Sequence, residues 1–103
     1  MYPKIGIRPV IDGRQFGVRE DLEQQTMHMA NAAKDLIESN LRYPDGTKVE
    51  CVIAPTTIGG GAEAYECETF FQTQKVCATL SVTPCWCYGS ETMDLNPLTI
   101  KAV

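Results

Sequence analysis

The chain has 103 residues, of which 44% are hydrophobic and 21% are charged, and these values are typical of one globular domain. Thirteen acidic against nine basic side chains give a formal net charge of −4, and acidic residues such as Asp12 interrupt the most closely spaced arginines, Arg8, Arg14 and Arg19. Because clustered Lys and Arg are needed to neutralise phosphates, the composition argues against a general binder of nucleic acid or of anionic membranes.

The N-terminal stretch does not read as a secretion signal. Residues 1–4 lead directly into a short apolar segment that contains an arginine, unlike the uninterrupted apolar core of a secretion signal. No run in the sequence approaches the roughly 20 apolar residues of a membrane span. We therefore expect a cytoplasmic protein with no membrane and no nucleic-acid partner.

The N-terminal half predicts a buried strand and then a long helix. Residues 4–11 are rich in Ile and Val, which is typical of a strand in a parallel sheet, and residues 12–17 form a loop with two glycines. Residues 19–41 place side chains at spacings of three and four, and acidic residues in the first turn complement the helix dipole. The predicted stripe of this helix is Leu22, Thr26, Met29, Ala33, Leu36, Ile37 and Asn40.

The C-terminal half repeats the alternation. It predicts a strand over 48–54, a glycine-rich loop over 55–61, a helix from 62 to about 74, a strand over 76–83 and a loop over 84–91. The remainder, to the end of the sequence, shows no clear period. For the second helix the expected packed side is Ala62, Tyr65 and Phe70, with Cys67 or Phe71 as further candidates.

The order strand–helix–strand–helix–strand indicates an α/β fold, a three-layer (αβα) Rossmann-like domain built on a parallel sheet. Three strands are few for such a sheet, and a parallel sheet needs both faces covered. Since about 20 residues without a helical pattern follow the third strand, we expect a domain that is cut short.

The cysteines and the single histidine, His28, leave two readings open. An odd number of cysteines without a secretion signal disfavours a disulfide framework, and the C-x-C pair lacks the partners of a tetrahedral zinc site. Reduced, mostly buried thiols are the alternative to a metal role. The five cysteines are Cys51, Cys67, Cys77, Cys85 and Cys87.

Candidate chemistry is concentrated in the three loops that follow the predicted strands. Ligands of open α/β sheets bind beyond the carboxyl ends of the strands, so residues 12–17, 55–61 and 84–91 should meet at one edge. The three consecutive glycines at 59–61 open a helix and could hold an anion, but they match neither nucleotide-binding glycine motif. A plain flexible connection is the other reading of this loop.

Arg14 and Trp86 are the more informative pair in these loops. An aromatic face covers the apolar C–H side of a sugar, and a guanidinium offers several fixed donors to hydroxyl oxygens. Together they predict a polyol contact, with a surface charge and a packing or interface tryptophan as the alternative. We find no residues that make a convincing catalytic or metal-binding set.

Two segments resemble bacterial L-fucose isomerases. Residues 3–14, continuing through 17–20, are similar to the opening of that family, and residues 82–92 are similar to a second stretch of it. Shorter similarities fall between them in the family's order, at 23–29, 49–53 and 62–64. The resemblance covers nearly the whole chain and is weakest at 39–48 and after residue 95.

The resemblance implies a function that composition and spacing do not reach. Members interconvert L-fucose and L-fuculose, and also D-arabinose and D-ribulose, through an ene-diol; as aldose–ketose isomerases they are intramolecular oxidoreductases. They use Mn2+ and assemble as hexamers. The first domain lends substrate contacts to the active site of a neighbouring subunit, and alignment places those contacts on Arg14 and Trp86.

The resemblance also implies what this chain lacks. The family's Mn2+ ligands lie in later domains, and no position here matches them. We therefore expect residues 1–103 to be the first part of the N-terminal domain of a longer, multi-domain sugar isomerase, to bind no cofactor and to be inactive alone. The alternatives are a free-standing, non-catalytic α/β binding module and a subunit-interface module.

Overall fold

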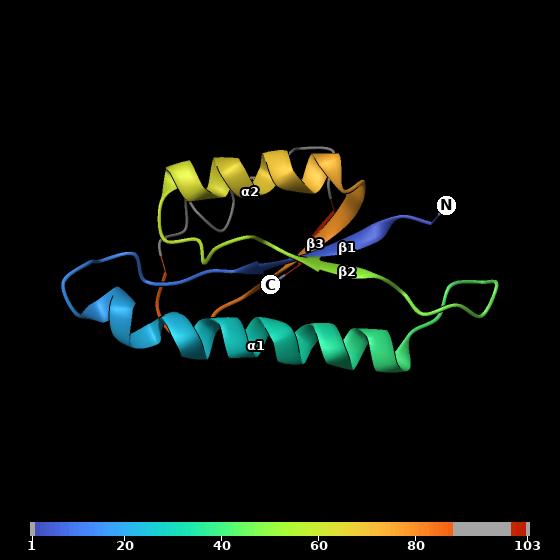
Figure 1. The fold of residues 1–103 in the computed structure, drawn as a ribbon, viewed down its shortest axis with the longest axis horizontal. Coiled ribbons are helices and arrows are strands. Elements are labelled where there is room, and N and C mark those ends of the chain that lie inside the picture. Colours follow the sequence, from blue (N-terminus) through green and yellow to red (C-terminus); the bar gives the residue numbers. More distant parts are fainter. Residues whose placement is uncertain (1, 88–99, 103) are drawn as a thin grey trace.

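Two helices enclose a sheet in the computed structural model, which describes residues 2–87 and 100–102. Helix α1 (Val18–Asn40) lies along one face of the sheet and helix α2 (Gly61–Thr73) along the other, as Figure 1 shows. The arrangement confirms the predicted α/β fold with three layers. Of the predicted loop over 84–91, residues 84–87 are described and residues 88–91 lie outside the described residues.

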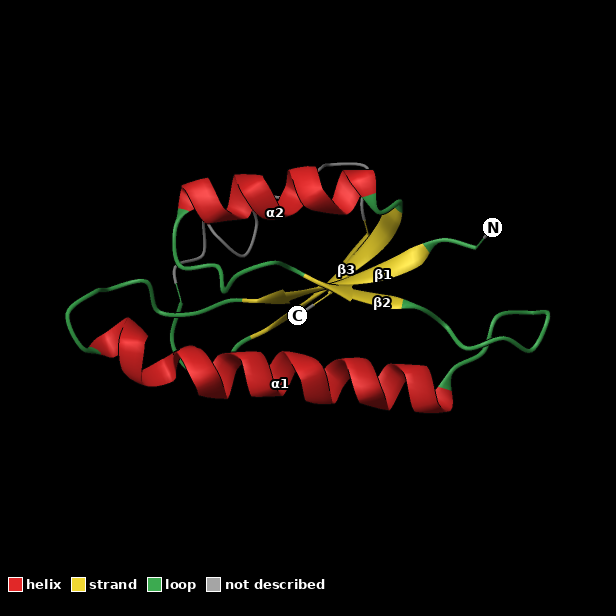
Figure 2. Cartoon of the chain, viewed as in Figure 1, coloured by secondary structure: helices red, strands yellow, loops and turns green. Residues whose placement is uncertain are grey.

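The sheet has the order β2-β1-β3-β4, and every neighbouring pair is parallel. Figure 2 shows the labelled strands β1, β2 and β3 between the two helices. Helix α1 leads from β1 to β2 on one side of β1, and α2 leads from β2 to β3 on its other side. The connections therefore diverge between β1 and β3, and the crevice at such a switch point is the usual ligand position in these sheets. The strands are β1 (Lys4–Pro9), β2 (Cys51–Ile53), β3 (Val76–Val82) and β4 (Ile100–Ala102).

Strand β4 was not predicted, and β2 is shorter than residues 48–54. Three residues are too few to show a period, so β4 is defined by its pairing with β3 and not by its own sequence. Only three residues of β2 pair with β1, because Lys48 instead forms an antiparallel bridge with Arg42. Neither the presence of β4 nor the short length of β2 can be predicted from the local sequence pattern alone.

Helix α1 packs on the sheet through small side chains. Thr26 and Ala30 are buried, and Ala30 joins Ile7 and Cys51 in a hydrophobic cluster on this face. Part of the predicted stripe is wrong, because Met29, Leu36 and Asn40 are exposed, Leu36 by 66%. The small residues let the helix approach the sheet closely, whereas the hydrophobic pattern favoured the larger side chains beside them.

The expected packed side of helix α2 is right in part: the candidates Cys67 and Phe71 are buried and Phe70 packs against them, whereas Ala62 and Tyr65 are exposed. Phe71, Cys67 and Ala64 are buried against the sheet, whereas Tyr65 is 73% exposed. The ring of Phe71 lies directly over Gly6 in β1, where a Cβ atom would come within 2.5 Å of it. The aromatic ring therefore depends on a glycine in the neighbouring strand, which the helix sequence cannot reveal.

Neither helix in the described ranges has both the length and the apolar character that would allow it to cross a membrane.

The thiols differ in their access to solvent, and this difference predicts their reactivity. Cys51 and Cys67 are buried, and burial raises the pKa of each thiol to about 11. Cys77 is exposed. Two pKa units reduce the thiolate fraction about 100-fold, so we expect a disulfide reagent at pH 8 to label Cys77 at least about tenfold faster than the two buried thiols. Peptide mapping assigns the label to each thiol, because Cys85 and Cys87 are also partly exposed. Loss of the fast-labelled Cys77 peptide in Cys77→Ser is the control; fast labelling of Cys67 in the folded chain would contradict the packing of α2.

Candidate functional site

At the carboxyl edge of the sheet, backbone hydrogen bonds join the loop after β1 to the loop after β2 and to the end of β3. The N–H of Val10 donates to the carbonyl of Val82 (2.9 Å), which ties the first loop to the end of β3. The N–H of Ile11 donates to the carbonyl of Ile58 (3.0 Å), and the N–H of Ile58 donates to that of Pro9 (2.8 Å). The predicted meeting of the three loops is therefore found for their described residues.

Two glycines let the first and second loops approach each other. A Cβ atom on Gly13 would lie 1.8 Å from the carbonyl oxygen of Gly59, a distance that no side chain tolerates. Gly59 is crowded too, though less severely, since its Cβ would lie 2.8 Å from the Cα of Gly13. Both positions therefore require glycine, and the plain flexible connection considered for residues 59–61 does not describe Gly59.

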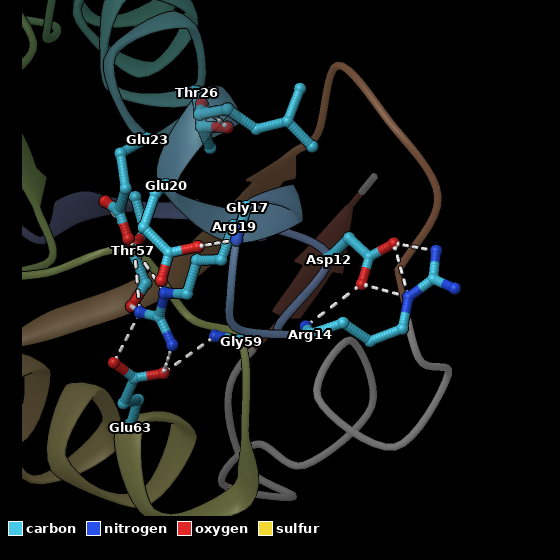
Figure 3. A network of polar contacts seen from close by, with 11 residues as sticks. Asp12, Arg14, Gly17, Arg19, Glu20, Glu23, Thr26, Thr57, Gly59 and Glu63 are labelled. Carbon is cyan, nitrogen blue, oxygen red and sulfur yellow. Dashed lines mark hydrogen bonds and ion pairs between the residues drawn. The ribbon is translucent and has the colours of Figure 1, made fainter.

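Arg14 is held by the carboxylate of Asp12 in the loop after β1 (Figure 3). Oδ2 of Asp12 accepts a hydrogen bond from Nη2 of Arg14 at 2.6 Å, and Oδ1 accepts from Nε at 3.0 Å. The backbone N–H of Arg14 donates to the same Oδ1 at 3.1 Å. The Arg14 guanidinium lowers the pKa of Asp12, so the carboxylate is charged at neutral pH.

The structure brings Arg14 and Trp86 together. The guanidinium carbon of Arg14 lies 5.5 Å from the ring centroid of Trp86, within the range of a cation–π contact. The Arg14 side chain is 60% exposed and Trp86 is 57% exposed. The pair therefore presents an aromatic ring and a planar cation to solvent at the switch point between β1 and β3.

A second network, centred on Arg19, fixes the start of both helices (Figure 3). Its guanidinium donates to the carboxylates of Glu23 in α1 and Glu63 in α2 and to the carbonyl of Thr57 in the loop between β2 and α2. Sequence reasoning missed this residue. Only its pairing with Glu23 four positions along the helix was visible, because Glu63 is 44 positions away.

Glu63 already occupies the glycine-rich helix start that could have held an anion. Its Oε1 accepts the backbone N–H of Gly59 at 2.9 Å, and both of its oxygens pair with Arg19. Burial raises the pKa of Glu63, but the bonds from Arg19 and Gly59 outweigh this effect and lower it overall. A phosphate would have to displace a charged carboxylate, so the geometry disfavours the phosphate reading.

The resemblance implies Mn2+, but the described part of the chain contains no set of side chains that fits this ion as ligands. No three His, Cys, Asp or Glu side chains gather there in a way that could hold a metal ion. The carboxylates at the carboxyl edge, Asp12, Glu23 and Glu63, each face an arginine. We therefore derive no chemical step through Mn2+, and the position of its ligands stays a prediction.

The strand order and the loop contacts define a doubly wound α/β domain with its switch point between β1 and β3. The family described as "L-fucose isomerase, first N-terminal domain" matches residues 2–103. The chain belongs to this family, as the resemblance of residues 3–20 and 82–92 predicts. Proteins named L-fucose isomerase from Streptococcus pneumoniae strains Hungary19A-6, CGSP14 and JJA are each 62% identical to it over 96 residues. The aligned region covers 93% of this chain and 16% of each relative, so the chain spans about a sixth of their length.

Proposed function

We propose that the chain acts as the first domain of an L-fucose isomerase and supplies sugar contacts through Arg14 and Trp86. The observation that carries the proposal is the contact between these two side chains, which come from loops 72 positions apart and lie 5.5 Å from each other. Identity of 62% to proteins of that name supports the choice of sugar class. Neither side chain is buried, so both have surface to offer a ligand.

The chemistry of the pair suits a neutral sugar. The indole of Trp86 can cover the apolar C–H face of a pyranose, whose hydrogens carry the positive charge that a π-face attracts. The guanidinium of Arg14 can donate to hydroxyl oxygens from a fixed plane. Neither group moves a proton at neutral pH, so both bind and orient the substrate, and chemistry at C1 and C2 needs other residues.

For the whole protein we propose isomerisation of L-fucose, the sugar in the relatives' name, and more specifically an aldose–ketose isomerisation to L-fuculose through an ene-diol. Such a reaction needs a base for the C2 proton and a Lewis acid at the carbonyl, and we propose Mn2+ as the Lewis acid. The residues described here offer no set that supplies both, and we expect the 103-residue chain alone to be inactive. We propose further that the sugar site is shared with a neighbouring subunit of a hexamer and that the protein is cytoplasmic.

One observation favours an interface role as the second candidate function. Phe16 is 97% exposed and has a positive φ of 67°, an uncommon conformation for a residue with a bulky side chain. It lies two residues after Arg14, in the loop that carries the sugar contact. An exposed aromatic ring at this edge suits contact with another subunit or domain.

Domain exchange tests the proposed function. We define the hybrid isomerase as the Streptococcus pneumoniae enzyme in which this chain replaces the matching N-terminal segment. The proposal predicts that the hybrid isomerises L-fucose and that removing the segment abolishes turnover while Mn2+ content stays unchanged. A deleted enzyme with the same KM and kcat as the hybrid would contradict it. The alternative, a free-standing binding module, makes a different prediction: calorimetric titration of the isolated chain with L-fucose, L-fuculose and L-fucitol should then show binding.

A further inference from the structure

Asp12 fixes the plane of the Arg14 guanidinium. Only 4% of the Asp12 side chain is exposed, so its own position is set by its surroundings. It accepts bonds from Nε and Nη2 of Arg14 together, as well as from the backbone N–H of the same residue. Because the guanidinium is a rigid fork, two bonds along one of its edges determine how the whole group is oriented.

A side chain that is 60% exposed, like that of Arg14, loses rotamer entropy when it is confined. The two bonds from Nε and Nη2 to the Asp12 carboxylate are charge-assisted and fix a direction. A cation–π contact such as that with Trp86, at 5.5 Å to the ring centroid, is weaker at an exposed site and less directional. Of these two contacts, the one with Asp12 therefore restrains the guanidinium more strongly.

We infer that Asp12 is a positioning residue: it holds the guanidinium of Arg14 over Trp86 and cancels its charge, so that the surface favours an uncharged polyol over an anionic ligand. The choice of ligand class rests on the proposed function, whereas the positioning is a property of the chain itself. Asp12 touches no ligand in this scheme. Its carboxylate is buried and acts through Arg14.

Fluorescence quenching of the 103-residue chain tests the inference, because Trp86 is its only tryptophan. Acrylamide is neutral and reports access to the indole, and iodide is an anion and reports the local charge as well. The variants are Asp12→Asn, Arg14→Ala and Arg14→Lys, with Asp35→Asn as a matched control that removes the same charge from an exposed position of α1. Far-UV circular dichroism monitors the fold of each variant.

Asp12→Asn should raise the acrylamide quenching constant about 1.5- to twofold, because the guanidinium no longer covers the indole. It should raise the iodide constant by more, since the variant also loses a negative charge that repels the anion near the indole. Arg14→Ala should raise the acrylamide constant to the same degree and lower the ratio of iodide to acrylamide quenching. Asp35→Asn should leave both constants at the wild-type values.

Arg14→Lys keeps Asp12 intact and decides the question if Asp12→Asn loses its fold. An ammonium cannot form the paired bonds, so acrylamide quenching should match that of Arg14→Ala. Wild-type quenching in Arg14→Lys, or equal effects of Asp12→Asn and Asp35→Asn, would overturn the inference. The two proposals can fail separately. If the 103-residue chain follows the expected quenching pattern but Arg14→Ala leaves the sugar KM of the hybrid isomerase unchanged, the proposed function is contradicted and the positioning role of Asp12 stands.

Discussion

Replacing Arg14 by Ala in the hybrid isomerase should raise the KM for L-fucose about 10- to 100-fold, because hydrogen bonds from a charged donor contribute about 1.5–3 kcal/mol. Trp86→Ala should have an effect of similar size, since it removes the ring that covers one face of the sugar. We expect kcat to change less than KM in both variants, because neither side chain takes part in proton transfer. Steady-state kinetics with L-fucose, at saturating Mn2+, give both constants.

Matched controls separate loss of a sugar contact from loss of a surface side chain. Arg42→Ala removes an exposed arginine that follows α1, and Tyr65→Ala removes an aromatic residue that is 73% exposed on α2. Both should keep the KM of the hybrid, and all four variants should keep its Mn2+ content. If Arg14→Ala and Trp86→Ala behave like these controls, the assigned contacts are wrong.

The second large effect concerns the glycine that lets two loops of the site meet. Gly13→Ala should lower the free energy of unfolding by about 3 kcal/mol, because the new Cβ collides with backbone that cannot move aside cheaply. The collision is with the carbonyl oxygen of Gly59, 1.8 Å from the Cβ position. For a chain of this length the loss corresponds to a fall in Tm of roughly 10–20 °C.

Gly61→Ala is the control for this prediction, since a Cβ there would meet nothing within 4 Å. It lies at the first position of α2, where alanine is a better helix former, so stability should stay the same or rise slightly. Urea denaturation followed by circular dichroism measures both variants. Equal stability of Gly13→Ala and Gly61→Ala would show that the two loops do not approach as described.

The fold could be predicted from sequence because its signals are local. Residues 4–11 and 76–83 have the Ile, Val and small-residue content of buried strands, and α1 has an apolar period with an acidic first turn. Pairing with a partner cannot be read in this way. The three residues of β4 become a strand only through β3, and the contact of Phe71 with Gly6 joins two elements that no local pattern connects.

In the candidate site, too, the residues with a local sequence signal could be predicted and those defined by distant partners could not. Arg14 and Trp86 could be found because each stands in a loop after a strand, and parallel topology brings such loops to one edge. Their contact at 5.5 Å then follows from the fold. The role of Arg19 could not be found, because its partners come from three segments and its sequence context is an ordinary charged helix start.

The hydrogen bonds between Asp12 and Arg14 could be predicted only in part. The two residues are only two positions apart, a spacing at which an aspartate often bonds to a following backbone N–H. The sequence does not show that the side chain of Arg14 folds back onto the same carboxylate. Burial of Asp12 decides this, and burial depends on the loops around it.

Calorimetric titration of the hybrid isomerase with L-fucitol, a polyol that cannot be isomerised, tests the account most directly. It measures sugar binding separately from chemistry. We predict that the double variant Arg14→Ala/Trp86→Ala weakens Kd at least about tenfold, the loss expected from one charge-assisted hydrogen bond, while Mn2+ content is unchanged. A double variant that binds L-fucitol as tightly as the hybrid would contradict the claim that this edge of the sheet contacts the sugar.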